Sequence, residues 1–345
     1  MKTIHVQASK SYDVIIGNNL LNQLGKHLFS VLNRTCKIAV ISDSNVYPLY
    51  GDIAKNSLIN NGFETVNYVF PAGEASKNPT TYISILNFLA ENHITRTDVI
   101  VALGGGVTGD MSGFAASTYL RGIPYIQVPT TLLAMVDSSV GGKTAIDLPA
   151  GKNLVGAFYQ PSLVLCDLDT LKTLPDMVFC DGCAEVIKYG VLFDVDLFNH
   201  LAAHGLNFDR EEVIGRCIEW KRNVVANDEF DTGARAKLNL GHTIGHGVEA
   251  LSNFTITHGQ AVAIGMSIIA KAGCKAIYKR LTEVIETFHL PTSTTFTANQ
   301  LYLCALSDKK RAGGTINLII PNSIGNCSIV PIDVDHLESF IKEGL

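Results

Sequence analysis

The chain has 345 residues, of which 47% are hydrophobic and only 17% are charged. This composition is sufficient for a large buried core, and it excludes a disordered, collagen-like or coiled-coil chain. The length is about twice that of a usual domain, so we expect two domains. A net charge of −5 does not favour nucleic acid or an anionic membrane surface as a partner.

Targeting and membrane signals are missing from the sequence. Met1–Asp13 is polar and alternating, unlike a signal peptide. The longest nearly apolar stretch, Ala261–Ala270, is far shorter than the roughly 20 residues of a membrane span. The eight cysteines are scattered along the chain, which is typical of reduced thiols. We therefore expect a cytoplasmic protein with no membrane partner.

The first half of the chain alternates strand and helix patterns. Thr3–Ala8 and Tyr12–Ile16 alternate apolar and polar residues as an antiparallel pair does. Helices are predicted from Pro79, capped by Asn78, to about Asn92, and over Met111–Tyr119. Apolar runs predict strands at Lys37–Asp43, Phe63–Phe70, Asp98–Leu103, Tyr125–Pro129 and Leu163–Asp167. Such runs are typical of parallel strands buried on both faces, so we expect a Rossmann-like open α/β sheet.

After about Pro175 the pattern becomes helical. The predicted helices are Asp176–Leu192, Asp209–Glu229, His242–Leu251, His258–Lys279 and Thr282–His289, with short strands only at Ile316–Pro321 and Cys327–Pro331. The fold class is therefore an α/β domain, residues 1–175, followed by a mostly α-helical domain, residues 176–345. No flexible linker separates them, which favours tight packing around a cleft.

A glycine-rich turn, Gly104–Asp110, follows a buried predicted strand and leads into a helix. Glycines there let backbone amides approach a phosphate, and the helix N-terminus favours negative charge. The spacing matches neither the P-loop nor the usual dinucleotide fingerprint, so a tight turn without ligand is the alternative. Asp43 ends a neighbouring strand, where a carboxylate can accept ribose hydroxyls or simply cap a turn.

The segment from Gly241 to Gly247 places His242 and His246 four residues apart, on one face of a helix. Thr243 stands where a zinc protease carries glutamate, which excludes that class. His258 begins a later helical stretch, and Glu185 is a lone carboxylate in an apolar helical run. Two histidines and a glutamate are a possible zinc site, but ordinary unliganded histidines fit the pattern equally well.

Basic and amide side chains gather in a third region. Lys143 follows two glycines, and Lys152 and Asn153 follow Gly151. Such groups suit a phosphate or carboxylate, although any one of these lysines could be a solvated surface charge.

Together these residues resemble the 3-dehydroquinate synthases, the sugar-phosphate cyclases of the shikimate pathway. The resemblance runs from about Ile41 to Lys310 and is densest in Val101–Asp110, Arg121–Thr131, Val136–Lys143, Gly151–Pro161, Ala184–Gly190 and Leu238–Glu249. Several blocks in one order are far more specific than a single motif.

The resemblance implies zinc, replaceable by cobalt, on Glu185, His242 and His258, with His246 as an acid/base group. It implies NAD⁺ contacts from Asp43, Gly73, Glu74, Lys77, Gly105, Gly106, Val107, Asp110, Thr130, Thr131, Asp137, Lys143, Lys152, Thr170, Leu171, Lys172 and Thr173. Catalytic or substrate contacts are implied for Lys143, Asn153, Lys188, Lys221, Arg235, Asn239, one of Lys309 and Lys310, and Arg121, from its own or a neighbouring subunit.

The implied reaction converts 3-deoxy-D-arabino-heptulosonate 7-phosphate to 3-dehydroquinate and phosphate. It consists of transient oxidation by NAD⁺, phosphate elimination, re-reduction and intramolecular aldol closure, and a homodimer is expected. One departure concerns the metal site: Gln260 replaces the usual glutamate after His258-Gly259, which puts a supporting contact to His258 in doubt.

Three alternatives remain at this point. A related cyclase of the valiolone or inosose synthase type would share the fold. A glycerol-type dehydrogenase is disfavoured because Glu185 stands where such enzymes usually carry aspartate. A non-enzymatic NAD-binding or scaffold protein would have lost ligands, whereas Glu185, His242, His246 and His258 are all present.

Overall fold

The computed structural model describes residues 1–306, 311–312 and 314–345, and it divides into two compact units. Unit 1 comprises Met1–Leu174 and Lys221–Phe230, and unit 2 comprises Pro175–Trp220 and Asp231–Leu345. The predicted boundary after residue 175 lies beside the first division. A further division falls inside helix α7 (Arg210–Asn227) and has no counterpart in the sequence prediction, because helical periodicity continues across it.

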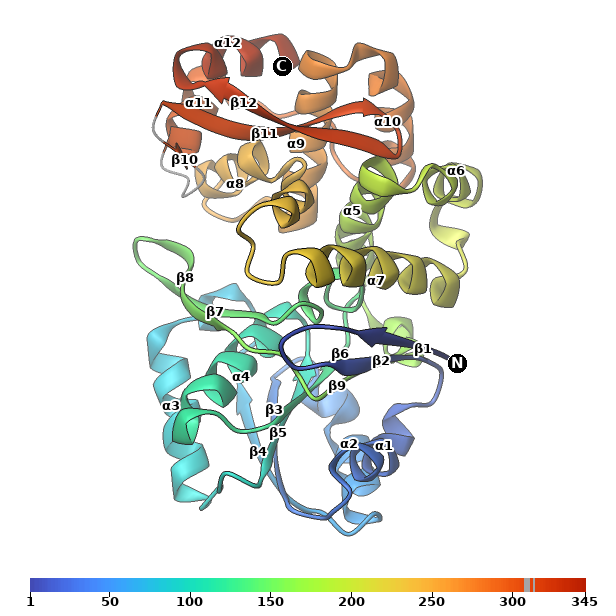
Figure 1. The fold of residues 1–345 in the computed structure, drawn as a ribbon, viewed down its shortest axis with the longest axis vertical. Helices are drawn as coiled ribbons and strands as arrows, with labels where there is room; N and C mark the ends of the chain where they lie inside the picture. The colour runs from blue at the N-terminus through green and yellow to red at the C-terminus, as the bar shows by residue number, and fades with distance from the viewer. Residues whose placement is uncertain (307–310, 313) are drawn as a thin grey trace. The chain divides into compact units, whose positions relative to one another are not determined.

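Unit 1 is built on a seven-stranded sheet with the order β1-β2-β9-β6-β5-β3-β4 (Figure 1). The strands are β1 (Lys2–Val6), β2 (Tyr12–Gly17), β3 (Lys37–Asp43), β4 (Glu64–Phe70), β5 (Val99–Gly104), β6 (Tyr125–Pro129) and β9 (Leu163–Asp167). β1 is antiparallel to β2, and every other pairing in this sheet is parallel. The predicted open α/β sheet and its antiparallel pair are confirmed.

Helices cover both faces of this sheet. Ile38 and Val40 of β3 belong to a core shared with α1 (Leu24–Leu32) and α2 (Tyr47–Ile59). Ala39 and Ile41 belong to the opposite core, with α3 (Pro79–Glu91) and α4 (Gly106–Thr118). Successive side chains thus enter different cores, which is why residues 38–41 of β3 form a continuous apolar run. The Asn78 side chain caps α3 by accepting the Thr81 N–H at 3.0 Å.

Two further parts of unit 1 carry predicted site residues. An antiparallel hairpin pairs β7 (Lys143–Leu148) with β8 (Gly151–Phe158), and the π-helical turn Ala134–Ser138 precedes it. The Lys221–Phe230 segment is fixed by Glu229, whose carboxylate accepts the backbone N–H of Ser9 at 2.7 Å and the Gln160 amide at 2.8 Å.

Unit 2 is mostly helical, as predicted. Its helices are α5 (Asp176–Phe193), α6 (Val195–His204), the first part of α7, α8 (His242–Leu251), α9 (His258–Gly273), α10 (Lys275–Thr287), α11 (Ala298–Leu306) and α12 (Val334–Gly344). A small sheet contains β10 (Arg311–Ala312), β11 (Thr315–Ser323) and β12 (Asn326–Asp333). In the described part of the chain, no helix combines the length and apolar character that crossing a bilayer requires.

The prediction of one helix over His258–Lys279 is wrong. The backbone of Cys274 is extended (φ −152°, ψ 75°) and separates α9 from α10. Its N–H bonds the Ala270 carbonyl at 2.8 Å, and its thiol donates to the Asn322 carbonyl at 3.5 Å. The bond to Ala270 is the last helical one, and the extended backbone of Cys274 ends α9 without interrupting the apolar pattern, so the break was not visible in the sequence.

Candidate functional site

Three side chains of unit 2 are possible metal ligands, and their ligand atoms lie close together. Glu185 lies in α5, and His242 and His258 are the first residues of α8 and α9. Glu185 Oε1 is 3.4 Å from His242 Nε2 and 3.2 Å from His258 Nε2. One carboxylate and two imidazoles are the donors of a catalytic zinc site that keeps a position open. The three predicted ligands therefore fit a divalent metal ion.

Glycines allow the helices that carry these ligands to pack closely. Gly241 has φ +79°, and a Cβ atom there would lie 2.6 Å from the Val262 carbonyl of α9. A Cβ atom on Gly245 would lie 2.8 Å from the Ala261 carbonyl. Both distances are too short for any side chain. The glycines beside His242 and His246 thus set the approach of α8 to α9.

Asp181 fastens the start of α9 to α5, one turn before Glu185. Its Oδ1 accepts the Gln260 N–H at 3.1 Å and the hydroxyl of Thr257. Gln260 Oε1 in turn accepts the Thr257 N–H at 3.1 Å and completes a capping box. The unusual Gln260 therefore caps α9, which orients His258. Sequence reasoning missed Asp181, although its position four residues before Glu185 places both on one helix face.

Charge in the ligand cluster is compensated by Lys188, which pairs with Glu185; both side chains are almost fully buried. Burial alone would raise the pKa of Glu185, but Lys188 and His242 hold it well below its usual range. Burial lowers the pKa of His242 despite Glu185, which favours a neutral ring. Burial opposes a charged His258, yet Glu185 and Glu249 raise its pKa to about 10. A metal ligand needs the unprotonated Nε2 of His258, the nitrogen that faces Glu185, so a bound metal and the doubly protonated ring exclude each other.

His246 lies beside the ligand cluster and is exposed. Its ring centroid is 5.5 Å from that of His242 and 6.3 Å from that of His258. Ring nitrogens of His246 and His258 and a carboxylate oxygen of Glu249 also lie within 4.8 Å of one another. An exposed imidazole next to a metal site is suitably placed for proton transfer. Glu249 was missed in the sequence, although it lies three residues after His246 in the same predicted helix.

In unit 1 several of the predicted cofactor residues lie at the carboxyl ends of the parallel strands. The Gly104 carbonyl at the end of β5 accepts the Thr130 N–H, just after β6, at 3.0 Å. α4 begins at Gly106, five residues earlier than predicted, so Gly106 and Val107 form its first turn. The Thr130 hydroxyl is buried and has no partner among the described residues. A helix N-terminus at this edge of a parallel sheet suits a pyrophosphate.

Asp43 serves partly as a local cap. Its Oδ1 accepts the N–H groups of Asn45 at 2.9 Å and Val46 at 3.1 Å. Its Oδ2 accepts the Thr108 hydroxyl at 3.3 Å, which connects the end of β3 with the glycine turn. The structure shows the turn cap, and the ribose contact of Asp43 stays a prediction.

A buried network joins three other predicted residues. Lys77 Nζ lies 2.6 Å from both Asp110 Oδ2 and Asn153 Oδ1. Lys77 is 4% exposed; burial opposes its charge, but Asp110 and Glu74 raise its pKa. Lys152 Nζ is 3.5 Å from Glu74 Oε1. Lys77 therefore holds Asp110 and Asn153 in place, whatever else it contacts.

We expect Lys77→Met to lower the free energy of unfolding by about 3 kcal/mol, because the carboxylate of Asp110, only 18% exposed, would lose its counter-charge. Urea denaturation at pH 7 measures the loss. Lys37→Met is the matched control: Lys37 pairs with the exposed Glu64 at 2.9 Å, and its loss should stay below about 1 kcal/mol. Equal losses in the two variants would contradict the role assigned to Lys77.

The remaining predicted residues of unit 1 are spread over several elements. Lys221 Nζ is 2.7 Å from Asp137 Oδ1. Tyr50 contacts the Thr170 carbonyl and the Thr173 hydroxyl, while Lys172 pairs with Asp169 at 2.7 Å. Arg121 has φ +69° and follows Leu120 at φ +49°. Two successive non-glycine residues in this region are strained, and such strain is common at functional sites. Of the others, Gly73 precedes the short helix Glu74–Ser76, and Leu171 lies in the short helix Leu168–Thr173. Thr131 follows β6 and Lys143 begins β7.

In unit 2, Arg235 and Asn239 lie in the short helix Ala234–Asn239. Arg235 is 1% exposed, and Asn239 donates to the Ala236 carbonyl at 3.1 Å. Lys309 and Lys310 lie outside the described residues.

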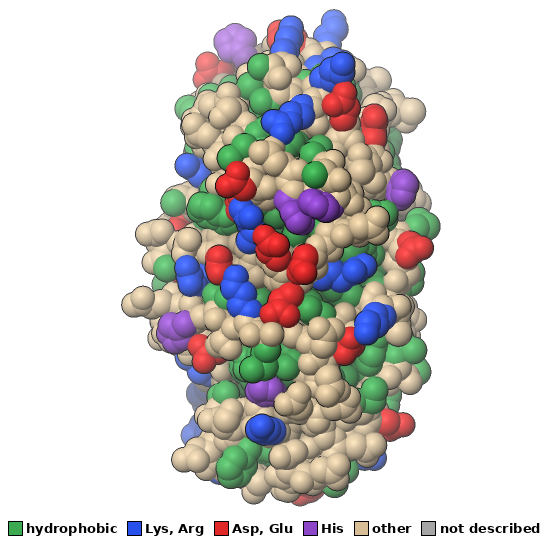
Figure 2. All heavy atoms as spheres, turned by 90° about the vertical axis from the view of Figure 1, so that its right-hand side faces the viewer, with side chains coloured by type: hydrophobic (Ala, Val, Ile, Leu, Met, Phe, Trp, Pro, Cys, Tyr) green, Lys and Arg blue, Asp and Glu red, His purple; other side chains and the backbone are tan. Residues whose placement is uncertain are grey.

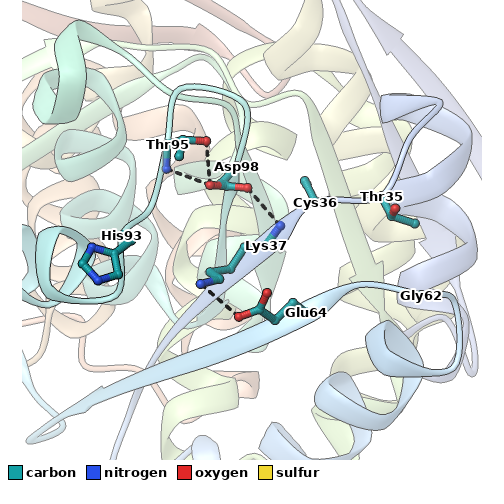
Figure 3. Close-up of a pocket in the computed structure, with 8 residues that line it drawn as sticks. All are labelled: Thr35, Cys36, Lys37, Gly62, Glu64, His93, Thr95 and Asp98. Carbon is teal, nitrogen blue, oxygen red and sulfur yellow. Dashed lines mark hydrogen bonds and ion pairs between the residues drawn. The ribbon is translucent and has the colours of Figure 1, made fainter.

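A cavity of about 450 Å³ occupies the other edge of the unit 1 sheet (Figure 3). It is lined by residues at the amino ends of β3, β4 and β5, and its charged groups pair with one another: Asp98 accepts the Lys37 N–H at 2.9 Å, and Lys37 pairs with Glu64. Ligands of open α/β sheets bind at the carboxyl ends of the strands, so this cavity is not the functional site.

Acidic and basic side chains are interspersed on the face drawn in Figure 2.

Two of the solved structures similar to this chain are cyclases. A 2-deoxy-scyllo-inosose synthase complexed with carbaglucose-6-phosphate, NAD⁺ and Co²⁺ has a TM-score of 0.89 and 25% identity, with 100% of both chains covered. The 2-epi-5-epi-valiolone synthase of Streptomyces hygroscopicus, with NAD⁺ and Zn²⁺ bound, has a TM-score of 0.88 and 26% identity, with 98% of both covered. The fold is that of the sugar-phosphate cyclases.

The sequence comparisons specify the family. The 3-dehydroquinate synthase N-terminal model matches residues 67–181, and the C-terminal model matches residues 182–311. The chain is 44% identical to the 3-dehydroquinate synthase of Pelobacter propionicus, with 95% of each covered. It is 42% identical to that of Streptococcus suis, with 96% of this chain and 97% of the other covered. The chain belongs to the 3-dehydroquinate synthase family, and the resemblance seen in the sequence is confirmed.

Proposed function

We propose that the protein is a phosphate-eliminating lyase that converts 3-deoxy-D-arabino-heptulosonate 7-phosphate to 3-dehydroquinate and phosphate. The observation that carries this proposal is the assembly of Glu185, His242 and His258 in a chain that matches 3-dehydroquinate synthases over nearly its whole length. The product is an intermediate of aromatic amino acid biosynthesis.

Two cofactors belong to the proposal, NAD⁺ and a divalent metal, zinc or cobalt. The donor atoms of Glu185, His242 and His258 fit the metal, and the glycine turn with the buried Thr130 hydroxyl fits a dinucleotide. When bound, the metal polarises a substrate hydroxyl and NAD⁺ accepts and later returns a hydride. Similar solved structures contain NAD⁺ with Co²⁺ or Zn²⁺, which supports this pair of cofactors.

The protein side chains supply proton transfer and positioning. His246 is proposed to take the proton from the hydroxyl that is oxidised. Lys188 is proposed to stabilise the negative charge of Glu185 through their ion pair. Lys143, Lys221, Arg235 and Arg121, with Asn153 and Asn239, would orient the phosphate and carboxylate of the substrate. A sequence of steps in one site depends on such fixed orientation.

A cyclase acting on another sugar phosphate is the alternative, because inosose and valiolone synthases share the fold. It is less supported, since identity to those structures is 25–26% against 42–44% for the 3-dehydroquinate synthases. Arg235, Lys221 and Asn239 also suit a substrate carboxylate, which heptulosonate phosphate has and sedoheptulose phosphate lacks.

A homodimer and a cytoplasmic location complete the proposal. The eight cysteines all lie within the described residues and none of them forms a disulfide, which supports a reducing compartment. The homodimer rests on the resemblance and is tested by light scattering in solution.

The decisive experiment supplies metal-loaded protein and substoichiometric NAD⁺ with a panel of sugar phosphates, and measures released phosphate together with the carbocyclic product. We expect rapid release from heptulosonate phosphate, many turnovers per NAD⁺, and little release from sedoheptulose 7-phosphate or glucose 6-phosphate. No turnover of heptulosonate phosphate would refute the proposal, and preferred turnover of another sugar would favour the alternative.

A further inference from the structure

Glu249 is a buried carboxylate that none of the roles above uses. It lies on α8, seven residues after His242, and only 3% of it is exposed. Its Oε2 is 3.6 Å from His258 Nδ1, an ion-pair distance. An ionised carboxylate is costly to bury unless it has a specific partner. The ring of His258 is such a partner for the carboxylate of Glu249.

The two nitrogens of the His258 ring face different groups. Nε2 is 3.2 Å from Glu185 Oε1 and lies on the ligand side, whereas Nδ1 faces Glu249. If Nε2 is to present a lone pair to a metal, the proton of the neutral ring must be on Nδ1. A carboxylate beside Nδ1 stabilises that tautomer and fixes the plane of the ring.

His242 shows the same arrangement with a weaker acceptor. Its Nδ1 donates to the Leu240 carbonyl at 3.0 Å, which leaves Nε2 facing Glu185. One ligand histidine is thus oriented by a neutral carbonyl and the other by a carboxylate. The Nδ1 of His242 makes a hydrogen bond at 3.0 Å, whereas the Nδ1 of His258 faces a carboxylate at ion-pair distance, 3.6 Å, so the two rings are oriented by different kinds of contact.

We propose that Glu249 is a positioning residue of the metal site, which accepts the Nδ1 proton of His258 and holds its Nε2 toward the metal. The proposal deepens the metal site of the proposed function and rests on it. The presence of Gln260 had put a supporting contact to His258 in doubt. In the structure Gln260 caps α9, and we assign the support of the His258 ring to Glu249. Glu249 is not itself a ligand, so one metal ion per chain is expected.

The test measures Zn²⁺ affinity of the full chain, stripped with a chelator and titrated back in competition with a chromophoric chelator. Glu249→Ala should weaken binding about 10- to 100-fold. Glu249→Gln should weaken it less, because the amide oxygen accepts the same proton without charge. Glu283→Gln, a change of the same type at a carboxylate whose side chain is 61% exposed on α10, should bind as the unchanged protein does.

Two further readouts separate positioning from general support of the fold. The metal-free variants should retain the secondary-structure content of the unchanged protein by circular dichroism, even where loss of the buried contact to His258 lowers their unfolding temperature. The visible absorption of bound Co²⁺ should change in Glu249→Ala. If Glu249→Ala does not fold, the Zn²⁺ affinity of the isosteric Glu249→Gln tests the proposal. Zn²⁺ affinity within about twofold of the unchanged protein in the folded variants would overturn the proposal, as would two metal ions per chain.

These outcomes are distinguishable from failure of the proposed function. If the unchanged protein binds no Zn²⁺, the metal site itself is refuted. If it binds Zn²⁺ but the Glu249 variants bind equally well, only the role of Glu249 is refuted. Neither result depends on measuring turnover.

Discussion

His246→Ala is expected to keep its metal and to lose turnover by about 100- to 10,000-fold, the usual contribution of an acid/base group. His246 is exposed beside the cluster, whereas the nitrogens of His242 and His258 face Glu185 at 3.4 and 3.2 Å. His242→Ala and His258→Ala should therefore lose the metal itself. Metal content by atomic absorption and phosphate release on the same preparations measure both effects.

A fourth histidine variant controls for the substitution itself. His336→Ala removes an imidazole of α12 that is 78% exposed, and it should retain both metal and turnover. If His246→Ala lost its metal as His242→Ala does, the division between ligands and acid/base group would be wrong. If His246→Ala kept full turnover, His246 would not be the acid/base group of the reaction.

Lys188→Met is expected to lower the free energy of unfolding of the metal-free protein by about 3–5 kcal/mol at pH 7. The ionised Glu185 would remain buried without its partner, and its pKa would rise. The loss should shrink as the pH falls, because the lowered pKa of Glu185 stabilises the unchanged protein only while this carboxylate is ionised. Urea denaturation at several pH values measures the effect.

Lys279→Met provides the comparison, because Lys279 is 90% exposed and lies 3.9 Å from Glu283 across one helical turn. It should show no measurable loss of stability at any of these pH values. A Lys188→Met protein as stable as Lys279→Met would show that Glu185 does not depend on Lys188 for its charge.

The strands of unit 1 could be predicted closely because burial on both faces leaves a continuous apolar run. Lys37–Asp43 was predicted with the bounds that the structure has. The helices α1 and α2 were not predicted, since they bury only one face and their polar positions blur the periodicity. The hairpin of β7 and β8 was missed because its glycines and lysines were interpreted only as a ligand pocket.

For the site, the sequence supplied the residue types, and the structure supplied their orientation. His242 and His246 share a helix face, so spacing alone could not show which of them faces Glu185. The roles of Asp181 and Glu249 depend on contacts between α5, α8 and α9, segments far apart in the chain. Such contacts leave no periodic signal in one sequence.

Lys221–Phe230 belongs to unit 1 although it follows part of unit 2 in the chain, and this order affects folding during synthesis. During synthesis, unit 1 is not complete at residue 174, because Ser9, Gln160 and Asp137 await partners carried by Glu229 and Lys221. More than 40 residues of unit 2 are produced before those partners emerge from the ribosome. A fragment ending near residue 175 would therefore be an unfinished domain, and the two halves of this chain cannot be separated by a single cut.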